Sequence, residues 1–239
     1  MPGVGVLLVL LLISSIPAIA VFAWFRLARY PFSPTRFLLS LLAGAASFFP
    51  ALLLQHILAA RGGIFLSAGR WGLFAEIFVR IAFTEELGRL LMLSLMFFTL
   101  YRFRPTLPGE QDPGSPQPSF ATMTCACGLI AGLGFAIVES AVYGASNPGN
   151  TLLRAAITAP LHGACGSRVG ASIGMFRESP VQAVFRFLTA VVIHGVYNFM
   201  LLMPGNLPPT AATLIALSSL ASSVLTIRAG MADSSIEAH

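Results

Sequence analysis

Seven apolar runs, each long enough to cross a lipid bilayer, follow one another along this chain. A helix needs about 20 apolar residues to cross the ~30 Å hydrocarbon core of a bilayer. Inside that core every backbone polar group must be bonded internally, so only helices and closed barrels are stable there. Charged residues make up 10% of the 239 residues, against about 25% in soluble domains. We therefore predict an all-α fold, a polytopic transmembrane helix bundle of about seven spans. The predicted spans are residues 4–25, 37–60, 71–100, 120–143, 151–176, 181–203 and 209–227.

The segments outside these runs predict a simple organisation. Proline and glycine crowd residues 102–119, so we expect a flexible cytoplasmic loop there. The small and polar residues 231–239 predict a disordered tail. No repeat at a fixed period is visible, so residues 1–230 are expected to form a single transmembrane helical domain. The first run has no basic segment before it and is followed by Arg26 and Arg29, which indicates a retained anchor rather than a cleaved signal peptide.

The distribution of arginine predicts the orientation of the bundle. All 14 basic side chains are Arg, and cytoplasmic loops carry an excess of basic residues. If the N-terminus lies outside, seven arginines face the cytoplasm and three face outward. The seven are Arg26, Arg29, Arg36, Arg102, Arg104, Arg177 and Arg228, and the three are Arg61, Arg70 and Arg154. We therefore predict a multi-pass protein of the cell (cytoplasmic) membrane, with its N-terminus outside and its C-terminus in the cytoplasm.

Composition also excludes several functions. The net charge of +5 comes from arginines at loop ends, so the predicted partner is the lipid bilayer and not a nucleic acid. Lysine is absent, which excludes a retinal Schiff base. The three cysteines, Cys125, Cys127 and Cys165, lie within apolar runs without the spacing of a secreted framework. We interpret them as packing residues rather than disulfides or zinc ligands.

Ionisable side chains lie within four of the apolar runs, where a charged group costs at least ~2.5–3.5 kcal/mol. A chain keeps such groups when they have a partner or a task. Counted from the outer end of each run, Glu85, His162 and His194 lie roughly 12–20 Å deep, and Glu139 and Asn198 about 6–8 Å deep. These side chains would share one layer in the outer half of the membrane. This layer predicts a polar site built between helices.

Two adjacent acids in the third run share one cation. Arg89 is three residues after Glu86 and four after Glu85, so it can reach either carboxylate along one side of a helix. The carboxylate that Arg89 does not bind must be protonated, bound to a metal, or paired with another helix. Glu76 and Arg80 form another pair at the same spacing, which we interpret as a structural ion pair.

Small residues predict where helices pack closely. Gly166, Gly170 and Gly174 recur at every fourth position, so they leave one helix face flat enough for close backbone approach. Pro160 removes a backbone hydrogen bond two residues before His162 and can open the helix there.

Four short motifs stand in order on four successive runs. They are Glu85-Glu86-x-x-Arg89, Gly134-Phe135-x-x-x-Glu139, His162 with Gly166, and His194-x-x-x-Asn198. The ordered set resembles the PrsW-type intramembrane proteases, within the larger group that includes CaaX-prenyl-processing and bacteriocin-processing proteases. The resemblance covers residues 70–203, the expected protease core. Two positions differ from the pattern: Arg89 stands where Lys is usual, which changes the donor geometry, and Ser140 stands where Asn is usual.

The resemblance implies a hydrolase that performs intramembrane proteolysis on membrane-anchored protein substrates. The residue chemistry agrees with this reading, because a carboxylate among apolar helices can act as a general base on water. Glu85 or Glu86 would be that base, and His162 and His194 would stabilise the oxyanion or donate to the leaving amine. The supporting residues would be Arg89, Glu139 and Asn198.

Alternative mechanisms and classes stay open at this point. Our preferred mechanism uses no cofactor, but zinc is possible, with Glu86, Glu139, His162 and His194 as its ligands. No HExxH-type local spacing supports a metal. A proton-coupled transporter also keeps Glu and His in its spans, although it more often shows internal duplication. A haem held by His162 and His194 would not require the two acids at 85 and 86.

Overall fold

The computed structural model describes residues 4–60, 69–103, 118–146 and 149–236. These residues form helices and turns without any β-strand. The elements are α1 (Val4–Leu27), α2 (Pro34–Ala60), α3 (Arg70–Ala75), η1 (Glu76–Phe83), α4 (Thr84–Phe103), α5 (Phe120–Ser146), α6 (Gly149–Leu153), η2 (Arg154–Thr158), α7 (Ala159–Met175), α8 (Pro180–Leu202) and α9 (Leu207–Ile236). The prediction of an all-α membrane bundle is confirmed.

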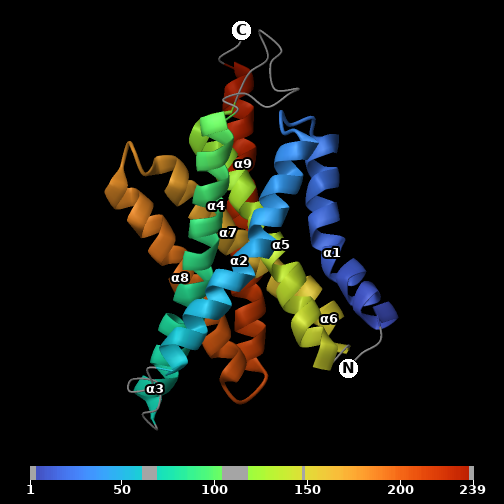
Figure 1. Cartoon of the computed structure of the whole chain (residues 1–239), viewed down its shortest axis with the longest axis vertical. Helices are drawn as coiled ribbons and strands as arrows, with labels where there is room; N and C mark the ends of the chain where they lie inside the picture. The colour runs from blue at the N-terminus through green and yellow to red at the C-terminus, as the bar shows by residue number, and fades with distance from the viewer. Residues whose placement is uncertain (1–3, 61–68, 104–117, 147–148, 237–239) are drawn as a thin grey trace.

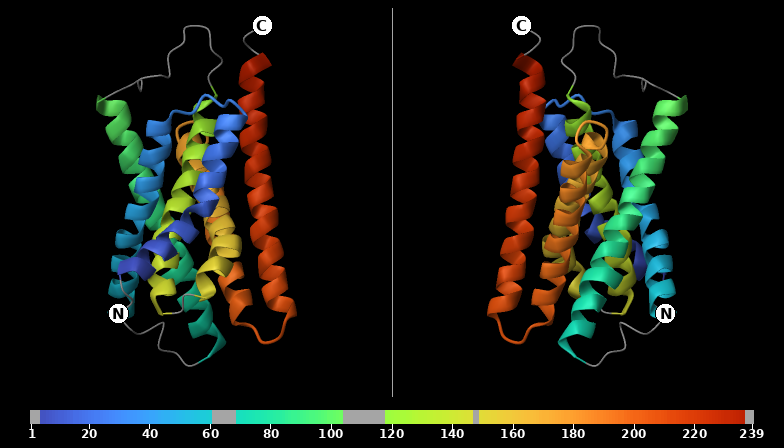
Figure 2. Two further views of the ribbon diagram at one scale, coloured as in Figure 1. Left: turned by 90° about the vertical axis from the view of Figure 1, so that its right-hand side faces the viewer. Right: turned by 90° about the vertical axis from the view of Figure 1, so that its left-hand side faces the viewer.

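Successive long helices run in opposite directions, and the N- and C-termini lie at opposite ends of the bundle (Figure 1). In the side views α9 lies along one side of the bundle beside α8, to which a short turn connects it (Figure 2). Large apolar side chains such as Leu12, Phe49, Trp71 and Phe185 are exposed on the outer surface. Exposed apolar side chains of this size suit a lipid environment, in which helices have no hydrophobic reason to bury them.

The number of spans differs from the prediction. Five of the described helices, α1, α2, α5, α8 and α9, are long and apolar enough to cross a membrane, so about seven was wrong. In the other two predicted spans a π-helix interrupts the α-helix. There α4 begins with Glu85 and Glu86 in its first turn, and α7 has 17 residues. The two predicted spans that do not meet the criterion are therefore the ones that contain α4 and α7, which carry polar site residues.

Each of the two π-helices leads directly into a site residue. The segment η1 ends at Phe83, two residues before Glu85, and η2 ends at Thr158, four residues before His162. Pro160 accounts for η2, because proline has no N–H and its ring displaces the carbonyl four residues earlier, which lies inside η2. Single π-helical turns inside α-helices are frequent at functional sites.

The glycines bring α5 and α7 together at the centre of the bundle. A Cβ atom on Gly132 would lie 1.9 Å from the backbone oxygen of His162. A Cβ on Gly166 would lie 2.2 Å from the oxygen of Gly128, and one on Gly170 would lie 2.0 Å from the oxygen of Thr124. The predicted close packing is confirmed, and it holds the backbone of His162 against α5.

Two further predictions concern segments near chain ends and loops. The tail was predicted to be disordered from residue 231, but α9 continues to Ile236. Residues 231–236 contain no proline or glycine, and Met231 is buried, so the helix continues over them. Most of the predicted loop, residues 104–117, and residues 237–239 lie outside the described residues. The three cysteines are buried free thiols, as predicted.

Candidate active site

Glu86 and Arg89 form an ion pair at the start of α4 that is closed to solvent. Both side chains are 0% exposed. Arg89 Nη1 donates to Glu86 Oε2, and the N–H of His194 Nδ1 donates to Glu86 Oε1 at 2.8 Å. Both oxygens of Glu86 are therefore occupied, one by a cation and one by a histidine from α8. Glu86 is held as a fixed anion that orients the His194 ring.

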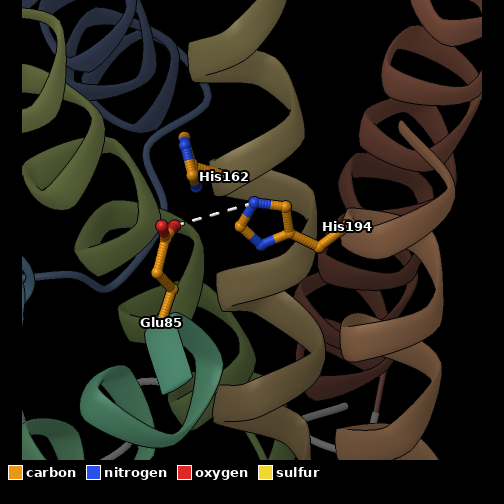
Figure 3. Close-up of side chains that lie close together, drawn as sticks. All are labelled: Glu85, His162 and His194. Atoms are coloured by element: carbon orange, nitrogen blue, oxygen red, sulfur yellow. Dashed lines mark ion pairs between the residues drawn. The ribbon is translucent and has the colours of Figure 1, made fainter. Parts of the chain in front are cut away.

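Glu85 is the acid that Arg89 leaves without a cation. Its Oε1 accepts a hydrogen bond from Gln55 Nε2 of α2 at 3.2 Å. Its Oε2 is buried and has no hydrogen-bond partner among the described residues. The nearest cationic candidate is His194 Nε2, at 3.6 Å from that oxygen (Figure 3). A buried carboxylate oxygen without a partner is costly, so this oxygen requires a proton, a water or an ion.

His162 of α7 is held at both ring nitrogens. Arg89 Nη2 donates to His162 Nδ1 at 3.3 Å. An arginine can only donate, so Nδ1 accepts and Nε2 carries the hydrogen. That N–H donates to Glu139 Oε2 of α5 at 2.9 Å, and Arg154 Nη2 of η2 donates to the same oxygen at 2.5 Å. A chain of charge-assisted hydrogen bonds thus fixes the tautomer and the orientation of His162.

The two imidazole rings pack against each other edge to face. The ring centroids of His162 and His194 are 5.0 Å apart, with the planes at 88°. Phe135 of α5 also packs against His162, at 5.0 Å between centroids, and the Arg89 guanidinium stacks on the Phe135 ring at 4.9 Å. Phe135 therefore walls the site and packs against two of its polar residues.

Six of the seven predicted site residues come together from four helices. They are Glu85, Glu86, Arg89, Glu139, His162 and His194, and all six are buried. Asn198 lies one turn beyond His194 on α8 and is half-buried. Its side chain makes no hydrogen bond within the described part of the chain. The predicted ion pair between Glu76 and Arg80 is present, half-exposed and outside this cluster.

Three of these residues could hold a metal ion. Glu85, His162 and His194 each offer one ligand atom, and these atoms lie within 4.8 Å of one another. Each histidine is bonded through its other nitrogen to a carboxylate, the arrangement that commonly supports zinc-bound histidines. An ion at His162 Nδ1 would replace the 3.3 Å contact with Arg89. With that one exchange, the donor set fits a divalent ion such as zinc.

The ligand set differs from the one that we predicted. For the zinc-dependent alternative alone, Glu86 and Glu139 were expected as ligands; in the structure both are bonded to ring nitrogens of the histidines and to arginines. Glu85 is the acid whose oxygen faces the histidines, so it takes their place in the candidate set.

Two contacts of the site were missed in the sequence. Gln55 binds Glu85, and Arg154 binds Glu139. Gln55 is a polar residue in the second apolar run, and Arg154 had been counted as an outward-facing charge. A search for uncharged polar residues in the runs would have found Gln55. Nothing local in the sequence shows that Arg154 reaches back to α5.

Comparison with known proteins adds one finding. A family model described as PrsW family intramembrane metalloprotease matches residues 33–224, a range that contains every residue of the cluster. No curated protein and no solved structure matches the chain.

Proposed function

Because the chain belongs to the PrsW family of intramembrane metalloproteases, we propose that Glu85, His162 and His194 form its catalytic centre. The reaction is hydrolysis of a peptide bond in a membrane-anchored protein. The observation that carries the proposal is the free, buried Oε2 of Glu85 at 3.6 Å from His194 Nε2. A carboxylate kept in this state among apolar helices costs stability, which a catalytic role explains.

The orientation of His194 suggests how water is bound. Its Nδ1–H donates to Glu86, so in the neutral ring Nε2 is an acceptor. Glu85 Oε2 and His194 Nε2 are then two acceptors that face each other. A water molecule between them donates one hydrogen to each, at about 2.8 Å, and keeps a lone pair for attack.

The reaction then proceeds by general acid–base catalysis. The oxygen of the water attacks the scissile carbonyl carbon while Glu85 takes a proton from that water. Glu85 then returns the proton to the leaving amine as the C–N bond breaks. The carbonyl oxygen becomes an oxyanion during the attack. The unpaired amide of Asn198, one turn from His194, is the donor that we assign to this oxyanion.

A metal-dependent form of the same centre is the second candidate. The family description and the convergence of three ligand atoms favour it. A zinc ion held by Glu85, His162 and His194 would lower the pKa of a bound water and polarise the substrate carbonyl. We prefer the glutamate-based form because both nitrogens of His162 are already bonded, to Arg89 and Glu139. In either form Glu86 and Glu139 orient the two rings.

A cavity of about 890 Å³ between α4, α7 and α8 suits the apolar anchor of a substrate. Its walls include Leu90, Phe97 and Phe187, and none of the three catalytic residues lines it. Leu90 lies one helical turn after Glu86. If the transmembrane segment of a substrate lies in this cavity, the part of the substrate that follows this segment lies close to the catalytic centre. With the predicted orientation, the bond that is cut would lie in the outer half of the cell membrane.

Trapping of the substrate tests this proposal. Glu85→Gln keeps the shape of the side chain and removes the base, so the variant should accumulate a bound, uncut membrane protein in native membranes. Glu76→Gln, in the segment η1 that precedes α4 and outside the site, should behave like the wild type. Equal recovery of bound protein from the two variants would refute the role of Glu85 and leave the family assignment untouched.

A further inference from the structure

A second, smaller cavity lies between α5, α7, α8 and α9, separate from the catalytic centre. Its volume is about 120 Å³, enough for several water molecules. Two arginines, Arg168 of α7 and Arg186 of α8, line it together with the hydroxyl groups of Ser167, Ser223 and Thr226. No acidic residue is among its described lining residues. The cavity therefore concentrates positive charge and hydroxyl groups without a counter-ion.

Arg168 uses only part of its hydrogen-bonding capacity within the protein. Nη1 donates to the backbone oxygens of Ala164 at 2.9 Å and Ser219 at 3.4 Å, and to Ser223 Oγ at 3.2 Å. A guanidinium has five N–H donors, and those on Nε and Nη2 have no partner in the described part of the chain. Three contacts therefore fix the group in place and leave further donors for a ligand.

Arg186 has no hydrogen bond and no ion pair within the described residues. It is exposed on α8 and lines both this smaller cavity and an open groove formed with Gln182, Phe185 and Thr189. A charged group in an apolar helix is retained when it has a partner or a task. An anion bound between the two arginines would supply that partner.

The position of the cavity indicates where such an anion comes from. Ala121 and Thr122, at the start of α5, are among the lining residues, and this start lies at the same end of the bundle as the end of α1, the start of α2, the turn from α7 to α8 and the end of α9 (Figure 1). The arginines at these positions are Arg26, Arg29, Arg36, Arg177 and Arg228. This excess of basic residues indicates the cytoplasmic side, whose leaflet carries anionic phospholipids.

We propose that Arg168 and Arg186 bind a phosphate group, supplied by the headgroup of an anionic phospholipid in this leaflet. Two arginines recognise phosphate oxygens through charge-assisted and bidentate hydrogen bonds. The open groove beside Arg186, formed with Gln182, Phe185 and Thr189 of α8, offers the exposed ring of Phe185 to an acyl chain. Inorganic phosphate has the same recognition chemistry but would leave that groove unused. The proposal is independent of the proposed catalytic function.

Lipid retention by the purified protein is the test. The detergent-solubilised full chain is incubated with phosphatidylglycerol or with phosphatidylcholine, and bound lipid is counted by native mass spectrometry. We expect about one tightly retained phosphatidylglycerol and an affinity about tenfold weaker in Arg186→Gln, the loss of a hydrogen bond to a charged group. Arg168→Gln should have a similar effect. Arg228→Gln, an exposed arginine at the same end that does not line the cavity, should retain lipid as the wild type does.

The remaining arms separate the two sources of phosphate and guard against misfolding. If inorganic phosphate displaces the lipid, and raises the melting temperature of delipidated protein in an Arg186-dependent manner, the phosphate site stands with free phosphate as its ligand. Arg168 also contacts α9, so the Arg168→Gln variant could fail to fold. In that case the Arg186→Gln variant is the test, because this substitution removes no internal bond. Unchanged lipid and phosphate binding by a folded Arg186→Gln protein would overturn the proposal.

Discussion

Oε2 of Glu85 and Nε2 of His194 face each other at 3.6 Å without a hydrogen bond between them. Every neighbouring carboxylate is bonded to both a cation and a histidine, so this oxygen is the exception within the cluster. The arrangement divides two adjacent acids into different roles. Glu86 is a structural anion fixed by Arg89, and Glu85 is the group that we propose to act on water.

The two acids should therefore differ in their effect on stability. Glu86→Gln leaves the Arg89 guanidinium, 0% exposed, without its counter-ion, and breaking a buried pair costs about 3–5 kcal/mol. Glu85→Gln removes an anion that has no cation, so its melting temperature should hold or rise. Thermal unfolding of both variants in the same detergent measures the difference. A Glu86→Gln protein as stable as the wild type would contradict the structural role of Glu86.

Arg154 should act on the reaction through Glu139 and His162. Loss of the 2.5 Å bond to Glu139 Oε2 frees that carboxylate and loosens the His162 ring, as happens when a group supporting a catalytic histidine is removed. Arg154→Gln should lower kcat by about 10–100-fold with little change in KM, and Arg154→Lys should restore part of the rate. Arg80→Gln, which breaks the half-exposed pair with Glu76, is the control. A pure rise in KM for Arg154→Gln would place the residue in substrate binding instead.

Metal content distinguishes the two forms of the mechanism. We expect purified, active protein to contain well under one transition metal per chain, and chelators to leave cleavage unchanged. Elemental mass spectrometry of the wild type and of the His162→Ala and His194→Ala variants provides the measurement. Stoichiometric zinc that is lost together with activity in both variants would establish the metal-dependent form, and His56→Ala, an exposed histidine, should then retain its zinc.

Much of the site could be predicted from the sequence because its residues stand in apolar runs, where any charge is conspicuous. The pairing within the site could not be predicted in this way. Arg89 reaches both Glu85 and Glu86 by helical spacing, and His194, 108 residues away from Glu86, completes the binding of Glu86. Arg154 was missed for the same reason, since its bond to Glu139 depends on how η2 packs against α5.

The number of spans was overestimated for a related physical reason. Hydropathy measures average composition, so it does not detect η1 and η2, where the hydrogen-bonding pattern changes inside an apolar run. For the tail, the prediction contained too little helix. Its small residues are compatible with a helix once Met231 is buried, and α9 continues over them to Ile236.

The orientation of the bundle is open to direct measurement. Tyr143 near the end of α5 and Phe176 in the turn after α7 are both exposed, at 56% and 59%, and lie at opposite ends of the bundle. In a background without the three native cysteines, Tyr143→Cys should react with a membrane-impermeant maleimide in intact cells. Phe176→Cys should react only after the membrane is opened. The reverse pattern would invert the topology and place the cleaved bond in the cytoplasmic half.

The rate of cleavage by Glu85→Gln tests the central claim most directly. Wild type, Glu85→Gln and Glu76→Gln are purified alike and given the substrate that the trapping experiment identifies, with unfolding temperatures measured in parallel. We predict that Glu85→Gln loses about 10²–10⁴-fold in rate, while its fold is kept and Glu76→Gln cleaves like the wild type. A folded Glu85→Gln protein that cleaves at the wild-type rate would show that Glu85 does not activate water.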